Sequence, residues 1–199
     1  MSADTGLSPG FDDPVQQCQG VFHAVLQALS RPGRVERLPS LEGVVPGLGA
    51  GSAAIALALV DFETPVWLDA ASSAAADYLR FHCGCVIVND PMQARFAFVK
   101  GFYALPALDS FLFGTDEEPS NSATLIIEVD TLVTDGPLVL TGPGIEFEHH
   151  LGVSGFDAPR LAERLAMTAL FPRGVDLFLT CDQNVAGIPR TTRITSIEG

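Results

Sequence analysis

The spacing of apolar residues predicts four helices along the chain. From Val15 to Leu29, apolar side chains recur every three or four positions, which is the period of one helix face. Asp13 and Pro14 precede this run as an N-cap and a first-turn proline, and the segment 30–33 (SRPG) ends it. Three further helices are expected on similar grounds over 52–59 with Ser52 as cap, 73–81 and 159–170.

Short runs of β-branched and other apolar residues predict strands between these helices. They lie at 66–68, 86–88, 95–99, 124–129, 175–180 and 185–189. A turn is expected at Asp135-Gly136-Pro137, and the segment 138–144 is expected to form a hairpin with a glycine-lined tip. Helices and strands alternate early, whereas hairpins dominate later. This pattern favours an α/β fold, a single domain with a mixed sheet flanked by helices.

Length and composition fit one sizeable core. The chain has 199 residues, of which 47% are hydrophobic, and contains no second core or internal repeat. We expect a flexible N-terminus at residues 1–10 and one domain over residues 11–199. No run approaches the ~18 apolar residues that a membrane span needs, and the N-terminal residues lack the pattern of a targeting signal. These features predict a cytoplasmic protein that does not enter a membrane.

The formal net charge of −13 argues against binding to nucleic acid, because it repels a phosphate backbone. An anionic ligand would therefore need a local exception. Lys100 is the only lysine, and the other ten cations are arginines, which suit bidentate contacts with carboxylates or phosphates. The four cysteines are expected to be reduced thiols, and Cys83-Gly84-Cys85 is expected to be a pair of buried small residues, not a zinc site.

Pro189-Arg190-Thr191-Thr192-Arg193 is the strongest candidate for a site. Its two guanidinium groups and two hydroxyls could donate many hydrogen bonds to a phosphonate or a triphosphate. The alternative is an edge strand whose arginines pair with acidic residues or with a partner protein. Arg80 and His82 form a second donor set, although at a helix C-terminus they could simply cap the helix.

Signatures of catalysis are missing from the sequence, so no catalytic residue is predicted. Asp61 and Asp176 could act as acids or bases, but carboxylates at strand ends are often merely solvated. Thr64 is grouped with Asp61 as a candidate ligand- or partner-binding residue. His149 and His150 lie near two glutamates and are expected in an exposed loop, so no metal site is predicted.

From residue 11 to about residue 194 the chain resembles the PhnH family, the H subunit of the bacterial carbon-phosphorus lyase. The resemblance rests on the order and spacing of several stretches taken together. They are FDDPVQ at 11–16, SRPG at 30–33, DFETPVWL at 61–68, YLRFH at 78–82, SATLI at 122–126, LTGPGI at 140–145, FPRGVDL at 171–177 and IPRTT at 188–192. The chain departs from the family at Cys83-Gly84-Cys85, where threonine and a small apolar residue are usual.

The resemblance implies an accessory role in phosphonate metabolism. Family members work with partner subunits G, I and L to transfer the ribose triphosphate of ATP onto methylphosphonate, forming alpha-D-ribose 1-methylphosphonate 5-triphosphate. It also implies homodimers, or assembly into the lyase core complex with subunits G, I and J. The implied fold is similar to the large domain of pyridoxal-phosphate-dependent transferases. We expect no pyridoxal phosphate, because the one possible Schiff-base lysine, Lys100, lacks a recognisable phosphate cradle.

Two hypotheses therefore stand from the sequence. In the first, the chain is an accessory subunit that positions its partners and has no turnover of its own. In the second, it is a phosphonate- or nucleotide-binding subunit with its own site around Arg190.

Overall fold

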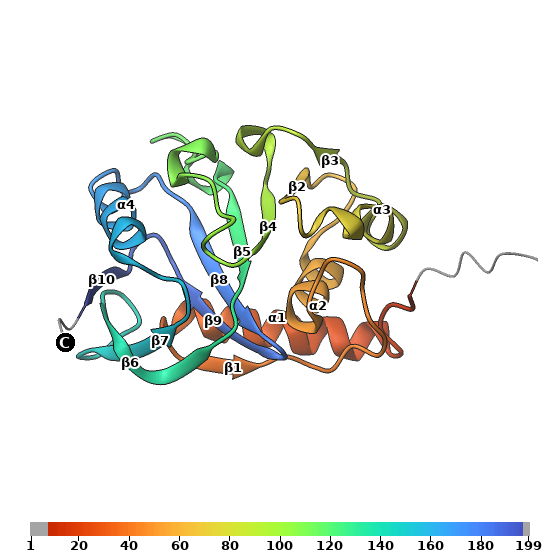
Figure 1. Ribbon diagram of the computed structural model, residues 1–199, viewed down its shortest axis with the longest axis horizontal. Helices are drawn as coiled ribbons and strands as arrows, with labels where there is room; N and C mark the ends of the chain where they lie inside the picture. The colour runs from red at the N-terminus through yellow and green to blue at the C-terminus, as the bar shows by residue number, and fades with distance from the viewer. Residues whose placement is uncertain (1–7, 197–199) are drawn as a thin grey trace, which may run out of the picture.

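The computed structural model describes residues 8–196, which are built around one large sheet (Figure 1). Within these residues the sheet has seven strands. In spatial order they are β1 (Val35–Arg37), β9 (Asn184–Ile188), β8 (Asp176–Cys181), β5 (Thr124–Glu128), β4 (Phe96–Lys100), β2 (Val66–Leu68) and β3 (Ile87–Val88). The strands from β8 to β3 are parallel, whereas β9 runs antiparallel to both β8 and β1. The prediction of an α/β fold with a mixed sheet is confirmed.

Three helices pack on one face of the sheet. They are α1 (Pro14–Ser30), α2 (Ala50–Leu59) and α3 (Ala76–Cys83), which follows a 3₁₀ turn at Ser73–Ala75. Asp13 caps α1 as predicted, since its carboxylate accepts a hydrogen bond from the backbone of Gln16 at 3.1 Å. Helix α1 lies directly on β9, because a Cβ at Gly187 would approach the Ala28 backbone to 2.7 Å. This face holds the first of two apolar cores.

Helix α2 begins earlier than the sequence predicted. Its N-cap is Gly49, and the expected cap, Ser52, lies inside the helix and is buried. The Ser52 hydroxyl is 2.8 Å from the hydroxyl of Thr180 on β8, so that it ties the helix to the sheet. The prediction that Ser52 caps the helix was therefore wrong. The Ser52 hydroxyl bonds to a distant strand instead, and such a tertiary contact cannot be inferred from the local sequence.

The opposite face of the large sheet carries a smaller sheet and helix α4 (Ala158–Thr168). Within residues 8–196 the smaller sheet has three antiparallel strands in the order β10 (Arg193–Ser196), β6 (Leu132–Thr141) and β7 (His149–Val153). Between these elements and the large sheet lies the second apolar core. It includes Phe102, Leu108 and Phe111, and the Phe111 ring meets Trp67 edge-on at 5.8 Å.

The predicted turn at Asp135-Gly136-Pro137 is wrong, because these residues lie inside β6. The register between β6 and β7 shifts between Val133 and Leu138, so the segment is a bulge. A Cβ at Gly136 would come within 2.1 Å of Gly152, and the two glycines therefore let the strands approach closely. His149 and His150 also belong to a strand, β7, and not to the expected loop.

The beginning of the described chain is attached to α3. The carbonyl of Ser8 is 3.0 Å from His82 Nε2, and that of Pro9 accepts a hydrogen bond from the Tyr78 hydroxyl at 3.2 Å. The rest of the segment predicted to be flexible, residues 1–7, lies outside the described residues. None of the helices between residues 8 and 196 is long and apolar enough to span a bilayer.

Candidate functional site

Arg190 and Asp176, both predicted as site residues, form an ion pair. Asp176 begins β8 and Arg190 follows β9, and the antiparallel register that joins Leu177 to Ile188 brings them together. Arg190 Nη2 lies 2.5 Å from Asp176 Oδ2, and Arg190 Nε lies 3.2 Å from Oδ1. The backbone N–H of Arg190 also donates to Oδ1, at 2.7 Å. The carboxylate is therefore engaged by both the side chain and the backbone of one residue.

The remaining donors of Arg190 bond to neighbouring loops. Nη1 donates to the carbonyls of Pro119 and Pro172 at 2.7 and 3.5 Å, and Nη2 also donates to the Ser122 hydroxyl at 2.5 Å. A guanidinium has five N–H groups, and these contacts with the two to Asp176 engage all of them within the described residues. With only 15% of its side chain exposed, Arg190 joins three loops and offers no spare donor to a ligand.

Thr191 and Thr192 occupy different environments. Thr192 is fully buried, and its backbone closes a turn onto the Pro189 carbonyl at 2.9 Å. Thr191 lines a surface pocket of about 250 Å³ together with Arg190, Arg193, Pro143 and Phe171. Arg193 is exposed and starts β10, an edge strand of the smaller sheet, which agrees in part with the edge-strand alternative for this segment. The predicted cluster is thus divided between the interior and the rim of a shallow pocket.

The other predicted site residues lie at the far side of the sheet. Arg80 Nη1 pairs with Asp77 at 2.9 Å in an exposed position on α3, and the His82 ring packs against Tyr78 with centroids 4.3 Å apart. Asp61 Oδ1 accepts hydrogen bonds from the Thr64 hydroxyl at 2.7 Å and from the backbone of Glu63 at 3.0 Å. The aspartate thereby closes a local turn before β2.

The two groups of predicted residues do not share a pocket. Arg190 follows β9, whereas α3 connects β2 to β3, which is five strand positions away. With neighbouring strands about 4.8 Å apart, that separation is roughly 20 to 25 Å. Arg80 and His82 therefore do not converge with Arg190.

A charged cluster at the carboxyl ends of the parallel strands was not predicted from the sequence. Lys100 and Glu128 end the adjacent parallel strands β4 and β5, and their side chains pair at 2.6 Å. Glu128 also accepts the N–H of Gly49 at the start of α2, at 2.8 Å. Buried Asp69, just after β2, accepts the backbone N–H groups of Ser72 and Lys100. The signal was available, since each residue ends or follows an apolar strand.

This cluster occupies the carboxyl edge of the parallel strands, where open α/β sheets commonly bind ligands. A pocket of about 250 Å³ opens there, lined by Lys100, Tyr103, Glu128, Asp130 and Ser154. Its cation is already neutralised by Glu128, and the Ser154 hydroxyl accepts the backbone N–H groups of Asp130 and Thr131 at 3.0 Å. The polar groups at this edge mainly stabilise one another and the loops that carry them.

Two arginines fasten α4 to the rest of the domain, and neither was predicted to matter. Arg160 donates to the carbonyls of Phe102, Leu105 and Pro106 and pairs with Glu163 at 2.8 Å. Arg164 is 1% exposed and donates to the carbonyls of Val175, at 2.9 Å, Ile188 and Pro189. Burial lowers the pKa of Arg164 to about 10, opposed by nearby Asp176, so the guanidinium remains charged at neutral pH.

Cys83 and Tyr78 should make stability fall at alkaline pH. Burial, with a smaller contribution from nearby thiols, raises the pKa of each group to about 12. Since both groups ionise more readily in the unfolded chain, the stability they contribute is complete below about pH 9 and is lost as pH rises towards 12. Urea unfolding at pH 8 and 10.5 measures this, and Tyr78→Phe should show the smaller decline. An equal decline in both proteins would contradict it.

Cysteines 83 and 85 do not form part of a metal cluster in the described chain. The Cys83 thiol faces the Ala56 carbonyl at 3.7 Å, and Cys85 is buried. Across residues 8–196, no three His, Cys, Asp or Glu side chains gather in a way that could hold a metal ion.

Together these features define a single-domain α/β protein whose buried charged side chains are bonded to its own strands and loops. Comparison with known proteins gives the family. The model of the bacterial phosphonate metabolism protein family, PhnH, matches residues 9–195, and the chain belongs to this family.

Two named relatives share most of the chain. The alpha-D-ribose 1-methylphosphonate 5-triphosphate synthase subunit PhnH of Rhizobium meliloti (strain 1021) is 38% identical over 197 residues, which cover 98% of each chain. The putative C-P lyase subunit protein HtxG of Stutzerimonas stutzeri is 32% identical over 176 residues, covering 88% of this chain and 85% of that protein. Both are named as subunits, and the family resemblance inferred from the sequence motifs is confirmed.

Proposed function

We propose that this chain is an accessory subunit of the carbon-phosphorus lyase machinery, the H-type subunit of alpha-D-ribose 1-methylphosphonate 5-triphosphate synthase. The observation that carries the proposal is the 38% identity with the Rhizobium meliloti subunit over 98% of both chains. The structure is consistent with an assembly role, because the charged side chains that could take part in chemistry, such as Arg190 with Asp176 and Lys100 with Glu128, are paired with one another. Its partners are then the G, I and J subunits, and its compartment is the cytoplasm.

Two finer points belong to the same proposal. The free chain is expected to form a homodimer, as the family resemblance implies, with a mass about twice the 21.0 kDa of one chain. Its fold is expected to be similar to the large domain of pyridoxal-phosphate-dependent transferases without use of that cofactor. Here Lys100, the one lysine, is held by Glu128 at 2.6 Å.

Co-expression with the G, I and J subunits of a carbon-phosphorus lyase tests the proposal. A tagged copy of this chain should recover all three subunits in one complex, whereas the purified chain alone should form no ribose triphosphate product from ATP and methylphosphonate. A chain that elutes without the three subunits, or that makes the product by itself, would show that it is not an accessory subunit.

A further inference from the structure

Helix α4 has its polar side turned inward and its apolar side turned outward. A helix on the surface of a domain normally buries its apolar stripe and exposes its charges. In α4 the most buried residues are Arg164 and Met167, with Arg160 and Glu163 beside them on the same inward side. The exposed positions of the helix are Ala158, Pro159, Ala162, Leu165 and Ala166, and exposed Ala169 follows it, whereas Leu161 is partly buried against the second core. The arrangement is the reverse of the one expected for a helix that faces only water.

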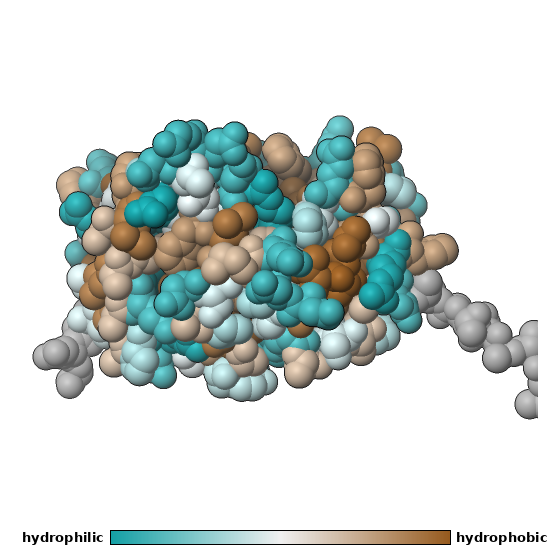
Figure 2. Space-filling model, turned by 90° about the horizontal axis from the view of Figure 1, so that it is seen from above, coloured by the Kyte–Doolittle hydropathy of each residue, from teal (hydrophilic) through white to brown (hydrophobic). Residues whose placement is uncertain are grey.

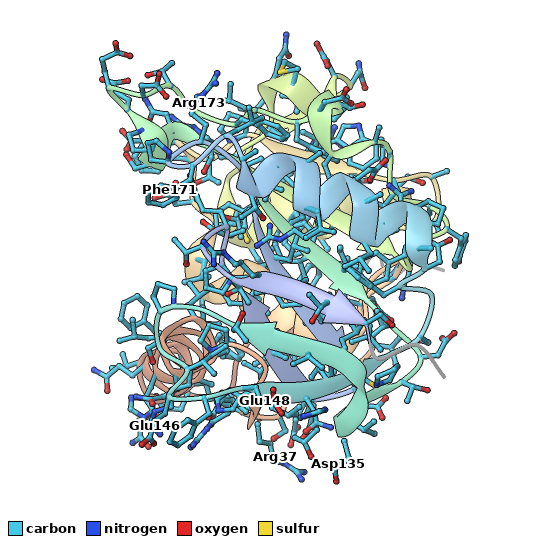
Figure 3. All side chains as sticks on the ribbon, turned by 90° about the vertical axis from the view of Figure 1, so that its left-hand side faces the viewer. Arg37, Asp135, Glu146, Glu148, Phe171 and Arg173 are labelled. Atoms are coloured by element: carbon cyan, nitrogen blue, oxygen red, sulfur yellow. The ribbon has the colours of Figure 1, made fainter. Side chains whose placement is uncertain are left out.

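Hydrogen bonds from two arginines hold α4 in this orientation, together with the packing of Leu161 and Met167 against the second core. Arg160 and Arg164 bond to backbone carbonyls in the segments 102–106, 175 and 188–189, so both ends of the inward face are attached. Charge-assisted bonds to carbonyls are stronger than ordinary ones. The outward apolar side therefore belongs to a firmly fixed helix. Figure 3 shows α4 crossing the front of the molecule, with no other element over it.

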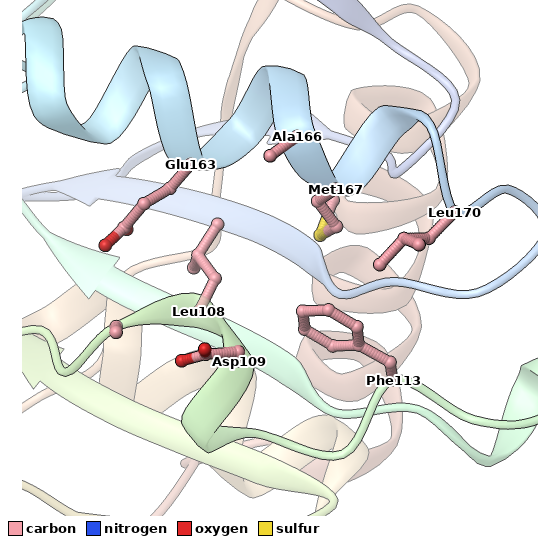
Figure 4. A pocket seen from close by; sticks show the side chains of 8 residues that line it. Leu108, Asp109, Phe113, Glu163, Ala166, Met167 and Leu170 are labelled. Carbon is pink, nitrogen blue, oxygen red and sulfur yellow. The ribbon is translucent and has the colours of Figure 1, made fainter.

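The apolar surface continues beyond the helix and includes a groove. Leu170 and Phe171 follow α4, and Phe171 is 63% exposed. Between α4 and the 3₁₀ turn Leu108–Ser110 lies a hollow of about 200 Å³, lined mainly by Leu108, Phe113, Met167 and Leu170 (Figure 4). Seen from above, brown and tan residues extend across the side of the molecule that carries α4 (Figure 2). A groove of this size accommodates an apolar side chain.

The charges that line the groove are negative, whereas exposed Arg193 lies beside Phe171 at the other end of the surface. Asp109 and Glu163 stand at its rim (Figure 4); Asp109 is exposed and has no bonded partner within the described residues, and Glu163 pairs with Arg160. The whole chain carries a formal charge of −13. Complementarity therefore favours an occupant with lysine or arginine beside its apolar residues. A second copy would bring two strongly acidic chains together, each with the same carboxylates at the rim.

We propose that the outward side of α4, with Leu170, Phe171 and the adjacent groove, is the surface on which another subunit of the assembly docks. The occupant is an apolar segment flanked by basic residues. This inference rests on the proposed function and adds where the partner binds and what chemistry it presents. Apolar area that is exposed in the free chain becomes buried in the complex, which explains why α4 keeps an apolar face towards solvent.

Leu165→Glu tests the docking surface, with Leu26→Glu as its matched control. Both residues are leucines on helices and are similarly exposed, 46% and 51%, but Leu26 lies on α1 at the opposite face of the sheet. Each variant is co-expressed with the G, I and J subunits and its affinity for them is measured. A charge buried in an interface centre should weaken binding by about 100-fold for Leu165→Glu. Leu26→Glu should bind like the unmodified chain.

Asp109→Lys tests the charge of the occupant. It should weaken binding by about tenfold at low salt and much less at 0.5 M salt, because rim charges act through screened long-range attraction. Binding that is unchanged or stronger after Asp109→Lys would overturn the basic character of the occupant.

The outcomes separate this proposal from the one it rests on. If the unmodified chain recovers no subunits, the accessory role itself fails. If it recovers them and Leu165→Glu does so equally, only the docking surface is wrong. If Leu165→Glu instead converts a homodimer into a monomer and leaves subunit binding intact, the occupant is a second copy, and the proposed partner is overturned.

Discussion

Asp176→Ala is expected to destabilise the protein by about 2 to 4 kcal/mol, somewhat less than the cost of breaking a fully buried ion pair, because the two side chains are 22% and 15% exposed. Arg190 would remain enclosed by the carbonyls of Pro119 and Pro172 with its charge uncompensated. Two hydrogen bonds from its side chain and one from its backbone would be lost at the same time. Urea unfolding at pH 7 measures the change in the free energy of unfolding.

Asp77→Ala is the matched control, because it also removes the aspartate of an aspartate–arginine ion pair. The Asp77–Arg80 pair lies in solvent, since 84% of the Asp77 side chain and 55% of the Arg80 side chain are exposed. Its loss should cost less than about 1 kcal/mol. Similar losses in the two variants would mean that burial does not set the strength of the Asp176–Arg190 pair. The double variant Asp176→Ala with Arg190→Met should regain part of the lost stability.

The Arg190–Asp176 ion pair also shows which feature of the candidate site could not be predicted from the sequence. Arg190 and Asp176 were both selected as candidates, because a cation and a carboxylate stood at strand ends in an acidic chain. Their direct contact depends on the antiparallel register of β8 and β9, which joins Leu177 to Ile188. Local patterns predict a strand but not its partner, and so the same residues were equally compatible with a ligand site.

The helices and longer strands were predictable because their signals are local. The cap at Asp13 and the apolar period of α1 predicted that helix, and the apolar runs predicted β4, β5 and β8. Strand β1 was missed, and β10 was foreseen only in the edge-strand alternative for 189–193, since they have three and four residues and owe their structure to pairing with β9 and β6. The bulge in β6 was taken for a turn because Gly and Pro give the same signal in both settings.

The orientation of α4 could not be inferred from its amphipathic pattern. That pattern predicts two faces correctly, but it assigns the apolar one to the core. The observed orientation depends on backbone carbonyls of distant segments, which accept hydrogen bonds from Arg160 and Arg164. Such acceptors become visible only in the folded chain. The candidate docking surface was therefore not predictable from the sequence, although most of its helical residues lay in the predicted helix 159–170.

Arg164→Ala should be the other strongly destabilising change, by about 3 to 5 kcal/mol. It removes the largest fully buried side chain of the described residues, leaves a cavity, and deprives the carbonyls of Val175, Ile188 and Pro189 of a donor. Arg37→Ala is the control: Arg37 is exposed, and within residues 8–196 its side chain bonds only to Gln183, so its loss should be within about 0.5 kcal/mol. Thermal or urea unfolding measures both.

Arg164→Met separates volume from hydrogen bonding at the same position. Methionine fills much of the space and removes a charge whose burial is unfavourable, as the lowered pKa of Arg164 indicates, but it cannot donate to the three carbonyls. We expect a loss of about 1 to 3 kcal/mol, smaller than for alanine, together with faster amide hydrogen exchange in α4. If Arg164→Met were as stable as the unmodified chain and α4 exchanged no faster, packing alone would hold the helix. The carbonyl bonds would then not be the reason why α4 turns its apolar side to solvent.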